Sequence, residues 1–239
     1  LVNNLVNFVD ALSGSISFKL EGIVPIIYNK DVSTWLNVSN LYPKNLTQNK
    51  IPFNLICNIF DSDGKKIKYI KKTILPDTDI KICLSDYLSL DKKNLSSGSA
   101  YIMRYSDYSG PRGSTRPHFF YKGLGSMATL HTQDGSVSSL YLDIANCINS
   151  ETRFLFIANM SNRTNKIKWM INNPNNKNIQ DDSFGELVIS ANGSDLIVLP
   201  QNEIHQSTTN YFIQASEAFK PYFIIASENF DNISVDHVG

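Results

Sequence analysis

The sequence predicts an all-β protein made of two tandem antiparallel β-sandwich domains, Ig-like or jelly-roll-like, with one short N-terminal helix. Short runs rich in Ile, Val, Phe, Tyr and Leu alternate with Asp-Gly, Asn-Gly, Pro and Ser clusters along most of the chain. No long helical pattern separates these runs, so a parallel sheet with crossover helices is not expected. Motifs of the first half return in the same order in the second half, which indicates an internal duplication.

Composition supports packed domains rather than a disordered chain. Hydrophobic residues make up 42% and charged residues 18% of the 239 residues. The formal net charge is zero, so a dedicated nucleic-acid-binding protein is not expected. No apolar run reaches the ~20 residues that a membrane-spanning helix needs. We place one domain at residues 15–125 and the other at 126–239, after residues 1–14, which form the helix or the remnant of a preceding segment.

Each element follows from a local pattern. Apolar residues at helical spacing over residues 1–12 predict the N-terminal helix, which Ser13-Gly14 ends. Asp61-Ser62-Asp63-Gly64 and Asn192-Gly193 predict tight turns, because Asp, Asn and Gly tolerate a left-handed backbone. Strands are predicted at 15–20, 24–28, 34–39, 53–60, 66–73, 80–84, 101–105, 118–121 and 127–131, and at 139–144, 153–159, 166–171, 186–190, 195–199, 211–215, 222–226 and 233–237.

The two halves match in chain order. Arg116-Pro117-His118-Phe119 matches Lys220-Pro221-Tyr222-Phe223, each with a cation, a proline, an aromatic ring and a phenylalanine. Residues 35–40 match 154–159, and both segments end in asparagine. Further matches join 53–57 to 168–172, 80–84 to 196–200, 101–105 to 211–215, and 127–131 to 233–237, which both end in histidine. The spacing between matches changes in loops, where insertions are tolerated.

Large apolar residues on these strands are expected to fill the two cores. The predicted core residues are Trp35, Leu36, Val38, Phe53, Leu55, Ile67, Tyr69 and Ile82 in the first domain, and Phe154, Phe156, Trp169, Leu187, Ile189, Leu196, Val198 and Phe223 in the second. Cys57 and Cys83 lie in strand-like runs, so a bridge between them is geometrically conceivable. Together with Cys147 the cysteine count is odd, which favours buried free thiols.

Charge is divided unequally between the domains. Residues 1–125 hold 16 Lys+Arg and 10 Asp+Glu, a net of +6, and residues 126–239 hold 6 and 12, a net of −6. The basic patch of the first domain is one hairpin with Lys65, Lys66, Lys68, Lys71 and Lys72. Opposite charges can attract the halves or join chains head-to-tail, and the hairpin can meet nucleic acid or an anionic glycan. The alternatives are ordinary solvated surfaces and lysines that guard an exposed strand edge.

No catalytic or cofactor motif is found. His118 and His131 lie on neighbouring predicted strands and could join Asp134 in a metal site, but no short-spaced ligand motif is present and Tyr222 replaces His118 in the second half. No serine lies in a G-x-S-x-G motif, and the Gly-rich segment 109–114 lacks the spacing of a phosphate-binding loop. We therefore expect no metal and no cofactor, and we favour a protein without catalytic activity.

Residues 105–122 are the strongest candidate binding region. Aromatic rings interleaved with cations suit stacking on a sugar ring or a base, or a protein hot spot. The residues proposed to bind are Tyr105, Tyr108, Arg112, Arg116, His118, Phe120, Tyr121 and Lys122. The alternative is that strand alternation turns about half of the rings into the core.

The first half orders a strand ending in Asn, a hairpin with an acidic-Gly turn, a Pro-led strand entering an Asp, and a late strand that begins with Pro. In this order it resembles the small β-sandwich of the sensory-rhodopsin transducer family, over most of each half. The resemblance implies a sandwich and a tendency to oligomerise. It carries no functional residue across, and the tandem arrangement departs from that family's single domain.

The sequence favours a structural or binding protein that associates with itself, through its oppositely charged domains, or with a surface partner protein. Carbohydrate binding, alone or as an accessory module of a glycan-active protein, is the first alternative. Anionic-polymer binding through the lysine hairpin is the second, although nucleic acid is not favoured. N-x-Ser/Thr sequons favour an extracellular or cell-surface location, and they lie at Asn37, Asn45, Asn94, Asn159, Asn162, Asn192 and Asn232.

Overall fold

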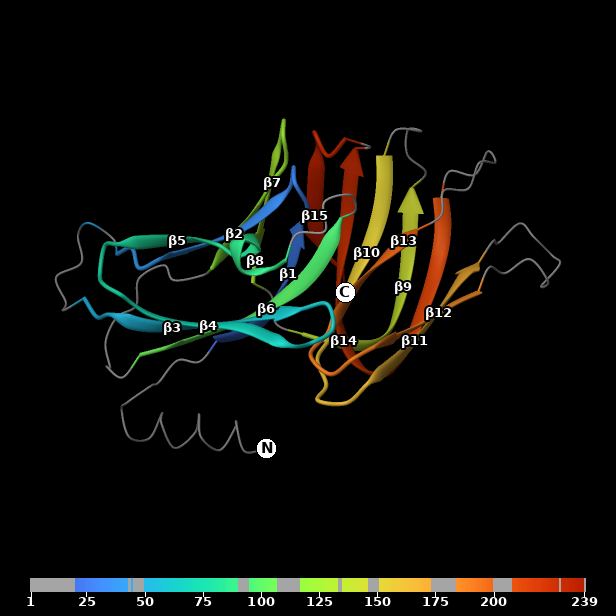
Figure 1. The fold of residues 1–239 in the computed structure, drawn as a ribbon, viewed down its shortest axis with the longest axis horizontal. Helices are drawn as coiled ribbons and strands as arrows, with labels where there is room; N and C mark the ends of the chain where they lie inside the picture. Colours follow the sequence, from blue (N-terminus) through green and yellow to red (C-terminus); the bar gives the residue numbers. More distant parts are fainter. Residues whose placement is uncertain are drawn as a thin grey trace.

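The computed structural model describes residues 20–42, 44, 50–89, 95–106, 117–132, 135–145, 151–172, 184–199, 208–227 and 229–238. These residues form antiparallel β-sheets and one short 3-10 turn, so the predicted all-β class is confirmed. The helix predicted within residues 1–14 lies outside the described residues. Figure 1 shows the first half of the chain on the left and the second half on the right.

The first half folds into two four-stranded sheets. Sheet A has the order β1-β6-β3-β4, with β1 (Leu20–Tyr28), β6 (Ser96–Tyr105), β3 (Phe53–Asp61) and β4 (Lys66–Ile74). Sheet B has the order β5-β2-β7-β8, with β5 (Asp79–Cys83), β2 (Ser33–Ser39), β7 (His118–Lys122) and β8 (Met127–His131), and the turn η1 (Ser85–Tyr87) follows β5. The two sheets enclose a core that includes Val24, Leu36, Leu55 and Phe119.

The second half forms the seven-stranded sheet C, which is centred on β14 (Thr208–Ser227), a strand of 20 residues. The N-terminal part of β14 pairs with β9 and β11, and its C-terminal part pairs with β10 and β15. A bulge between Gln214 and Phe219 separates the two parts, and the sheet folds over a core of its own. The other strands are β9 (Val137–Ala145), β10 (Glu151–Asn159), β11 (Asn165–Asn172), β12 (Phe184–Ile189), β13 (Ser194–Leu199) and β15 (Ile233–His237).

Strands pair in the same order in both halves. The order β1-β6-β3-β4 corresponds to β9-β14-β11-β12, and the order β5-β2-β7-β8 corresponds to β13-β10-β14-β15. β14 takes the places of both β6 and β7, which in the first half are separate strands joined through residues 106–117. This agreement supports an internal duplication, which we keep as a proposal.

Strand alternation decides which large residues enter the core, and it excludes several that the sequence assigned there. Leu36 points inward, so the adjacent Trp35 points outward and is 36% exposed. On β4, Ile70 and Ile74 point inward, so Tyr69 points outward. Ile67 lies at the bulge in the pairing of β3 with β4, and the exposed fractions of Ile67 and Tyr69 are 38% and 52%. Val198 is also exposed. The other predicted core residues are buried or half-buried.

The predicted match of residues 101–105 to 211–215 is out of phase. Tyr101 lies half-buried on the outer face of sheet A, whereas Tyr211 is buried in the core of sheet C. Side chains alternate between the two faces of a sheet, so shifting the match by one residue aligns inward positions with inward positions. The shifted match pairs Ile102 with Tyr211, and both are buried.

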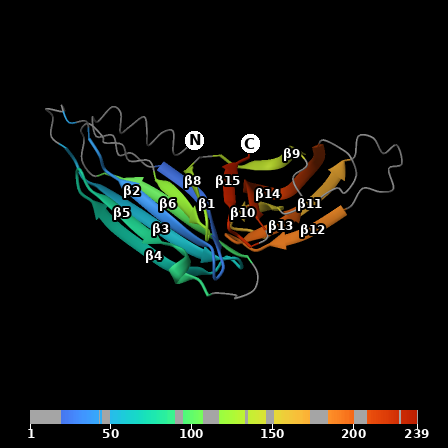
Figure 2. The same ribbon diagram turned by 90° about the horizontal axis from the view of Figure 1, so that it is seen from above.

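Sheet C is buried on both faces at β10, and this joins the two halves. Phe154, Phe156 and Ala158 of β10 belong to the core of the first half, while Leu155 and Ile157 belong to the core of the second. β10 and β15 lie against β1 and β8 where the halves meet (Figure 2). Each fully buried large side chain stabilises the folded state by about 1.5–3 kcal/mol, so the two halves depend on each other.

Two tyrosine hydroxyls bond to the free edge of β1, one from the second half and one from within the first half. Tyr222 donates a hydrogen bond to the Ile23 carbonyl over 2.5 Å, and Tyr121 donates one to the Pro25 carbonyl over 3.0 Å. An edge strand leaves such carbonyls without a ladder partner, and these hydroxyls satisfy them. Pro25 has no N–H, so its place on an edge strand loses no ladder donor.

A pair of turns also meets between the halves. The Ser194 N–H donates to the Ser62 carbonyl over 3.0 Å. Gly64 has a φ of +81°, and a Cβ there would lie 2.0 Å from the Ala191 carbonyl oxygen. Only glycine fits this position, because both the left-handed backbone and the close approach exclude a side chain.

The corresponding strands β2 and β10 each end at an asparagine, and the two asparagines have the same role. Asn40 Nδ2 donates to the carbonyls of Ile51 over 2.9 Å and Ile74 over 3.2 Å. Asn159 Nδ2 donates to the Ser190 carbonyl at the end of β12 over 2.9 Å. Both side chains are buried. Each therefore ties together strand ends that the sheet ladders leave open.

We predict that Asn40→Ala and Asn159→Ala each lower the free energy of unfolding by about 2–3 kcal/mol, because each leaves buried carbonyls without their donor. Urea unfolding followed by circular dichroism measures this. Asn232→Ala, at an exposed turn residue, is the control and should change stability by less than about 0.5 kcal/mol. Equal stability of the three variants would contradict the assigned role.

Candidate functional site

The structure distributes the predicted binding residues over three places. His118, Phe120 and Lys122 point outward from sheet B, and Tyr105 lies on the outer face of sheet A. Tyr121 is buried, which raises its pKa well above the usual value, and it bonds to β1, so it cannot contact a ligand at the surface. The predicted residues Tyr108, Arg112 and Arg116 lie outside the described residues.

An aromatic pair lies on the outer face of sheet B. Trp35 on β2 and Phe120 on β7 are directly opposite each other in the strand register. Phe120 is half-buried and Trp35 is at the surface, where its Nε1 donates to Ser33 Oγ over 3.0 Å. This bond fixes the plane of the indole ring. The pair offers an apolar strip on which a flat ligand can stack.

Polar side chains surround the aromatic pair. In the neighbouring row, Asn37 lies opposite His118, and His118 lies opposite His131 of β8. In the row on the other side, Ser33 lies opposite Lys122. The face therefore presents hydrogen-bond donors and acceptors around one exposed ring and one half-buried ring.

The predicted proximity of His118 and His131 is confirmed, since they are direct neighbours on β7 and β8. The His131 ring also meets the second half, with its centroid 4.9 Å from that of His237. Among the described residues, no group of three His, Cys, Asp or Glu side chains is placed to hold a metal ion.

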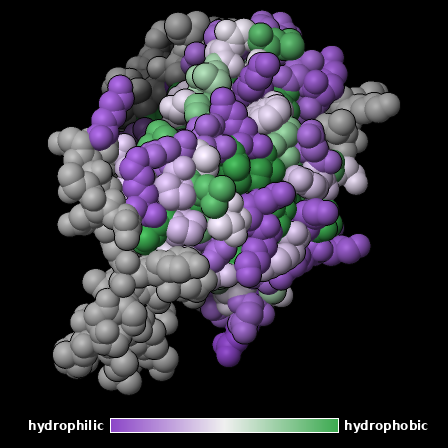
Figure 3. Space-filling model, turned by 90° about the vertical axis from the view of Figure 1, so that its left-hand side faces the viewer, coloured by the Kyte–Doolittle hydropathy of each residue, from purple (hydrophilic) through white to green (hydrophobic). Residues whose placement is uncertain are grey.

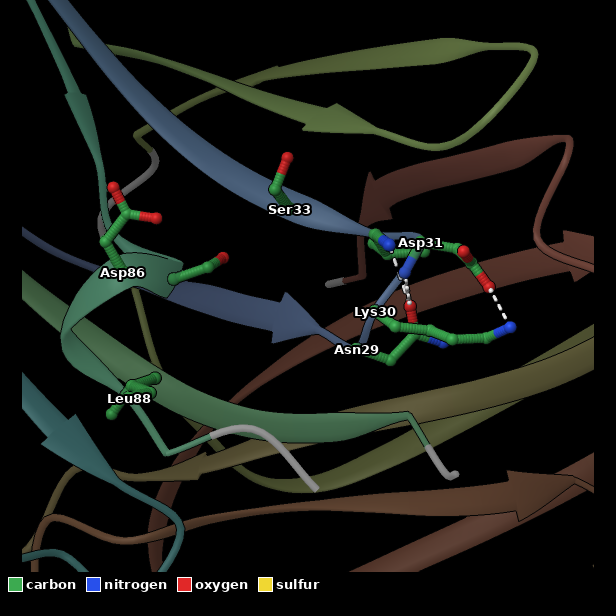
Figure 4. Close-up of a pocket in the computed structure, with 8 residues that line it drawn as sticks. Asn29, Lys30, Asp31, Ser33, Asp86 and Leu88 are labelled. Carbon is green, nitrogen blue, oxygen red and sulfur yellow. Dashed lines mark hydrogen bonds and ion pairs between the residues drawn. The ribbon is translucent and has the colours of Figure 1, made fainter. Parts of the chain in front are cut away.

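A pocket of about 460 Å³ opens beside Ser33, at one end of the aromatic pair. Figure 4 shows Ser33 and Asp86 on one side of it, and Asn29, Lys30 and Asp31 on the other. Asn29 Oδ1 accepts the Asp31 N–H over 2.7 Å, which shapes the turn, and Lys30 forms an ion pair with Asp31 at 3.4 Å. The lining of the pocket therefore includes two carboxylates, an ammonium and a hydroxyl, of which Lys30 and Asp31 pair with each other.

Backbone bonds hold the far wall of the pocket in place. Ser85 Oγ accepts the Thr34 N–H over 2.8 Å, and the Leu84 N–H donates to the Thr34 carbonyl over 2.8 Å. Burial and a hydrogen bond with Asp86 raise the pKa of the Cys83 thiol to about 11. The thiol beside the pocket is therefore protonated at neutral pH.

The lysine hairpin is not one continuous patch. Lys66 and Lys71 point outward from sheet A, Lys68 and Lys72 point to its other face, and Lys65 lies in the turn. Because β4 is an edge strand, these lysines also occupy the positions expected of edge protection. Figure 3 shows the side of the molecule that the first half forms, where hydrophobic areas are small and lie between hydrophilic ones.

Cys57 and Cys83 are free thiols on different sheets, so the bridge between them does not form. Cys57 is buried as predicted, whereas Cys83 is half-buried. Burial raises the pKa of Cys57 to about 12. Cys147 lies outside the described residues. The sequon at Asn159 is inaccessible because that side chain is buried and hydrogen-bonded. In the part of the chain that the structure describes, no helix is long and apolar enough to cross a membrane.

Sequence reasoning missed the pocket and the exposure of Trp35. Leu36 and Val38 point inward, and strand alternation then predicts that Trp35 points outward. The sequence therefore held the signal for the exposure of Trp35. The pocket lies between the turn before β2 and the turn after β5. A single sequence gives no signal that these two turns are close in space.

No family model and no curated protein matches the chain. Two solved structures of β-glucuronidase from Bacteroides uniformis align with 92% of this chain at 8% and 10% identity, with TM-scores of 0.21 and 0.22. Red sea bream transglutaminase aligns with 97% at 9% identity and a TM-score of 0.18. The chain covers 26%, 26% and 32% of these proteins. Alignments at this level establish neither a shared fold nor an activity.

Proposed function

We propose that this protein is a binding protein rather than an enzyme, and that it binds carbohydrate on the outer face of sheet B and in the adjoining pocket. The observation that carries the proposal is the neighbouring pair of aromatic side chains, Trp35 and Phe120, on a sheet face whose other described positions are mostly polar. The Trp35–Ser33 hydrogen bond makes this aromatic pair continuous with the pocket.

The chemistry of a sugar ring fits this arrangement. Its C–H face packs on an aromatic ring, and its hydroxyls point sideways as both donors and acceptors. Asn37 and His118 lie beside the two rings to meet such hydroxyls. In the lining of the pocket, the Asp86 carboxylate can accept a hydrogen bond from a hydroxyl donor.

The face of sheet C that corresponds to the outer face of sheet B is covered by protein, and its residues differ accordingly. Strand register aligns the pair Trp35–Phe120 with Phe154–Ile224, and the pair Asn37–His118 with Phe156–Tyr222. The four residues of the second half are buried against the first half. The exposed His118 would lose its hydration under such a cover, so the sheet B face suits a hydroxyl-rich ligand better.

Trp35→Ala and Phe120→Ala should each weaken glycan binding about tenfold or more, because an anchoring aromatic contact contributes about 2 kcal/mol. A glycan array identifies the ligand, and titration calorimetry with that glycan measures the affinities. Tyr141→Ala is the matched control, since Tyr141 is 77% exposed on the second half. A wild-type protein silent on the array, or two variants that bind as tightly as Tyr141→Ala, would refute the proposal.

A second candidate function is self-association, which the net charges of +6 on residues 1–125 and −6 on residues 126–239 favour. Exposed opposite charges attract at low salt and are screened at high salt. Light scattering should then show a mass above that of the monomer at low salt and the monomer mass at high salt. A monomer under both conditions would exclude charge-driven assembly.

A further inference from the structure

A second aromatic surface lies on the outer face of sheet A, over β6, β3 and β4. We call it the tyrosine face. Strand register places Tyr69 and Tyr101 on either side of Asn58, and places Tyr105 beside Asn54. Tyr69 is exposed, and the other two rings are half-buried. These residues come from the β3–β4 hairpin and from β6, and none belongs to the sheet B site.

Lysines border the tyrosine face on the β4 side. Lys71 Nζ lies 5.9 Å from the centroid of the Tyr105 ring, and Lys66 Nζ lies 5.8 Å from that of Phe60. Cation–π contacts of this kind hold an ammonium group next to a ring. The described outward positions of β3, β4 and β6 carry no carboxylate. The local field therefore favours an anionic ligand.

The arrangement of rings, amides and ammonium groups indicates which anion fits. Asn58 lies between two rings and Asn54 lies beside the third, where their amide groups can bond to hydroxyls of a stacked sugar. The Lys71 ammonium lies next to the Tyr105 ring. A ligand that stacks on this ring and pairs with Lys71 must therefore carry its anionic group on the stacked unit itself. A uronate has its carboxylate on the sugar ring itself, whereas a nucleotide separates its phosphate from its base by a sugar.

We propose that the tyrosine face binds an acidic polysaccharide whose sugar rings carry carboxylates. In Figure 1, sheet A lies below sheet B, so the outer faces of the two sheets point in opposite directions. The first half then holds two separate carbohydrate sites, one for hydroxyl-rich and one for acidic chains.

Affinity gel electrophoresis of the full chain in polygalacturonate tests this. The wild type should be retarded at low salt and less so at high salt, because salt screens the lysines. Tyr69→Ala and the double variant Lys66→Gln with Lys71→Gln should each weaken binding about tenfold or more. Lys166→Gln, an exposed lysine on the second half, is the matched control and should bind as the wild type does. Trp35→Ala should keep polygalacturonate binding, which separates this site from the one on sheet B.

Three results would overturn the proposal: no retardation of the wild type, full binding by Tyr69→Ala, or tighter binding of single-stranded poly(dT) than of polygalacturonate through the same residues. The second result would reduce the face to a nonspecific cation patch. The third would assign it to nucleic acid, for which aromatic stacking beside lysines is also suited.

Discussion

The fold depends on one strand that is buried on both faces. β10 presents Phe154 and Phe156 to the core of the first half, and Leu155 and Ile157 to the core of the second. An ordinary surface strand of an antiparallel sheet alternates apolar and polar residues, and this strand does not. Tyr222, on the neighbouring β14, adds a hydrogen bond to the edge of β1. Each half therefore completes the core of the other.

The same strand positions have different roles in the two halves. In sheet C they carry Phe156 and Tyr222, which the first half covers. In sheet B the aligned positions carry Asn37 and His118 around an aromatic pair, and the face is open to solvent. The two halves share a strand order and differ where one of them is covered, and this difference indicates the candidate site more clearly than any sequence motif.

Most strands could be predicted from the sequence because their signals are local. Runs of β-branched and aromatic residues between Asp-Gly and Asn-Gly turns predict strands close to those observed. An exception is β14, predicted as two strands because Ser216-Glu217-Ala218 interrupts the apolar pattern. Pairing with β9 and β11 on one part and with β10 and β15 on the other keeps this segment in the sheet.

The candidate sites were harder to predict because they depend on which face a residue occupies and on what covers that face. Tyr105 and Phe120 are close in sequence, yet they lie on different sheets of the sandwich. Tyr69 was assigned to the core, but β4 turns Ile70 and Ile74 inward. Lysines occupy many of the other positions of this strand, so its apolar pattern gives no clear phase. Phase within a strand and cover by another domain are properties of the whole fold.

The shared core is tested most directly by hydrogen exchange of the wild type and of Phe156→Ala. Removing this fully buried ring is expected to destabilise the protein by about 3–5 kcal/mol. If the halves share one core, amide protection should fall by similar amounts in β3 of the first half and in β11 of the second. Loss of protection confined to the second half would show that the two halves fold independently.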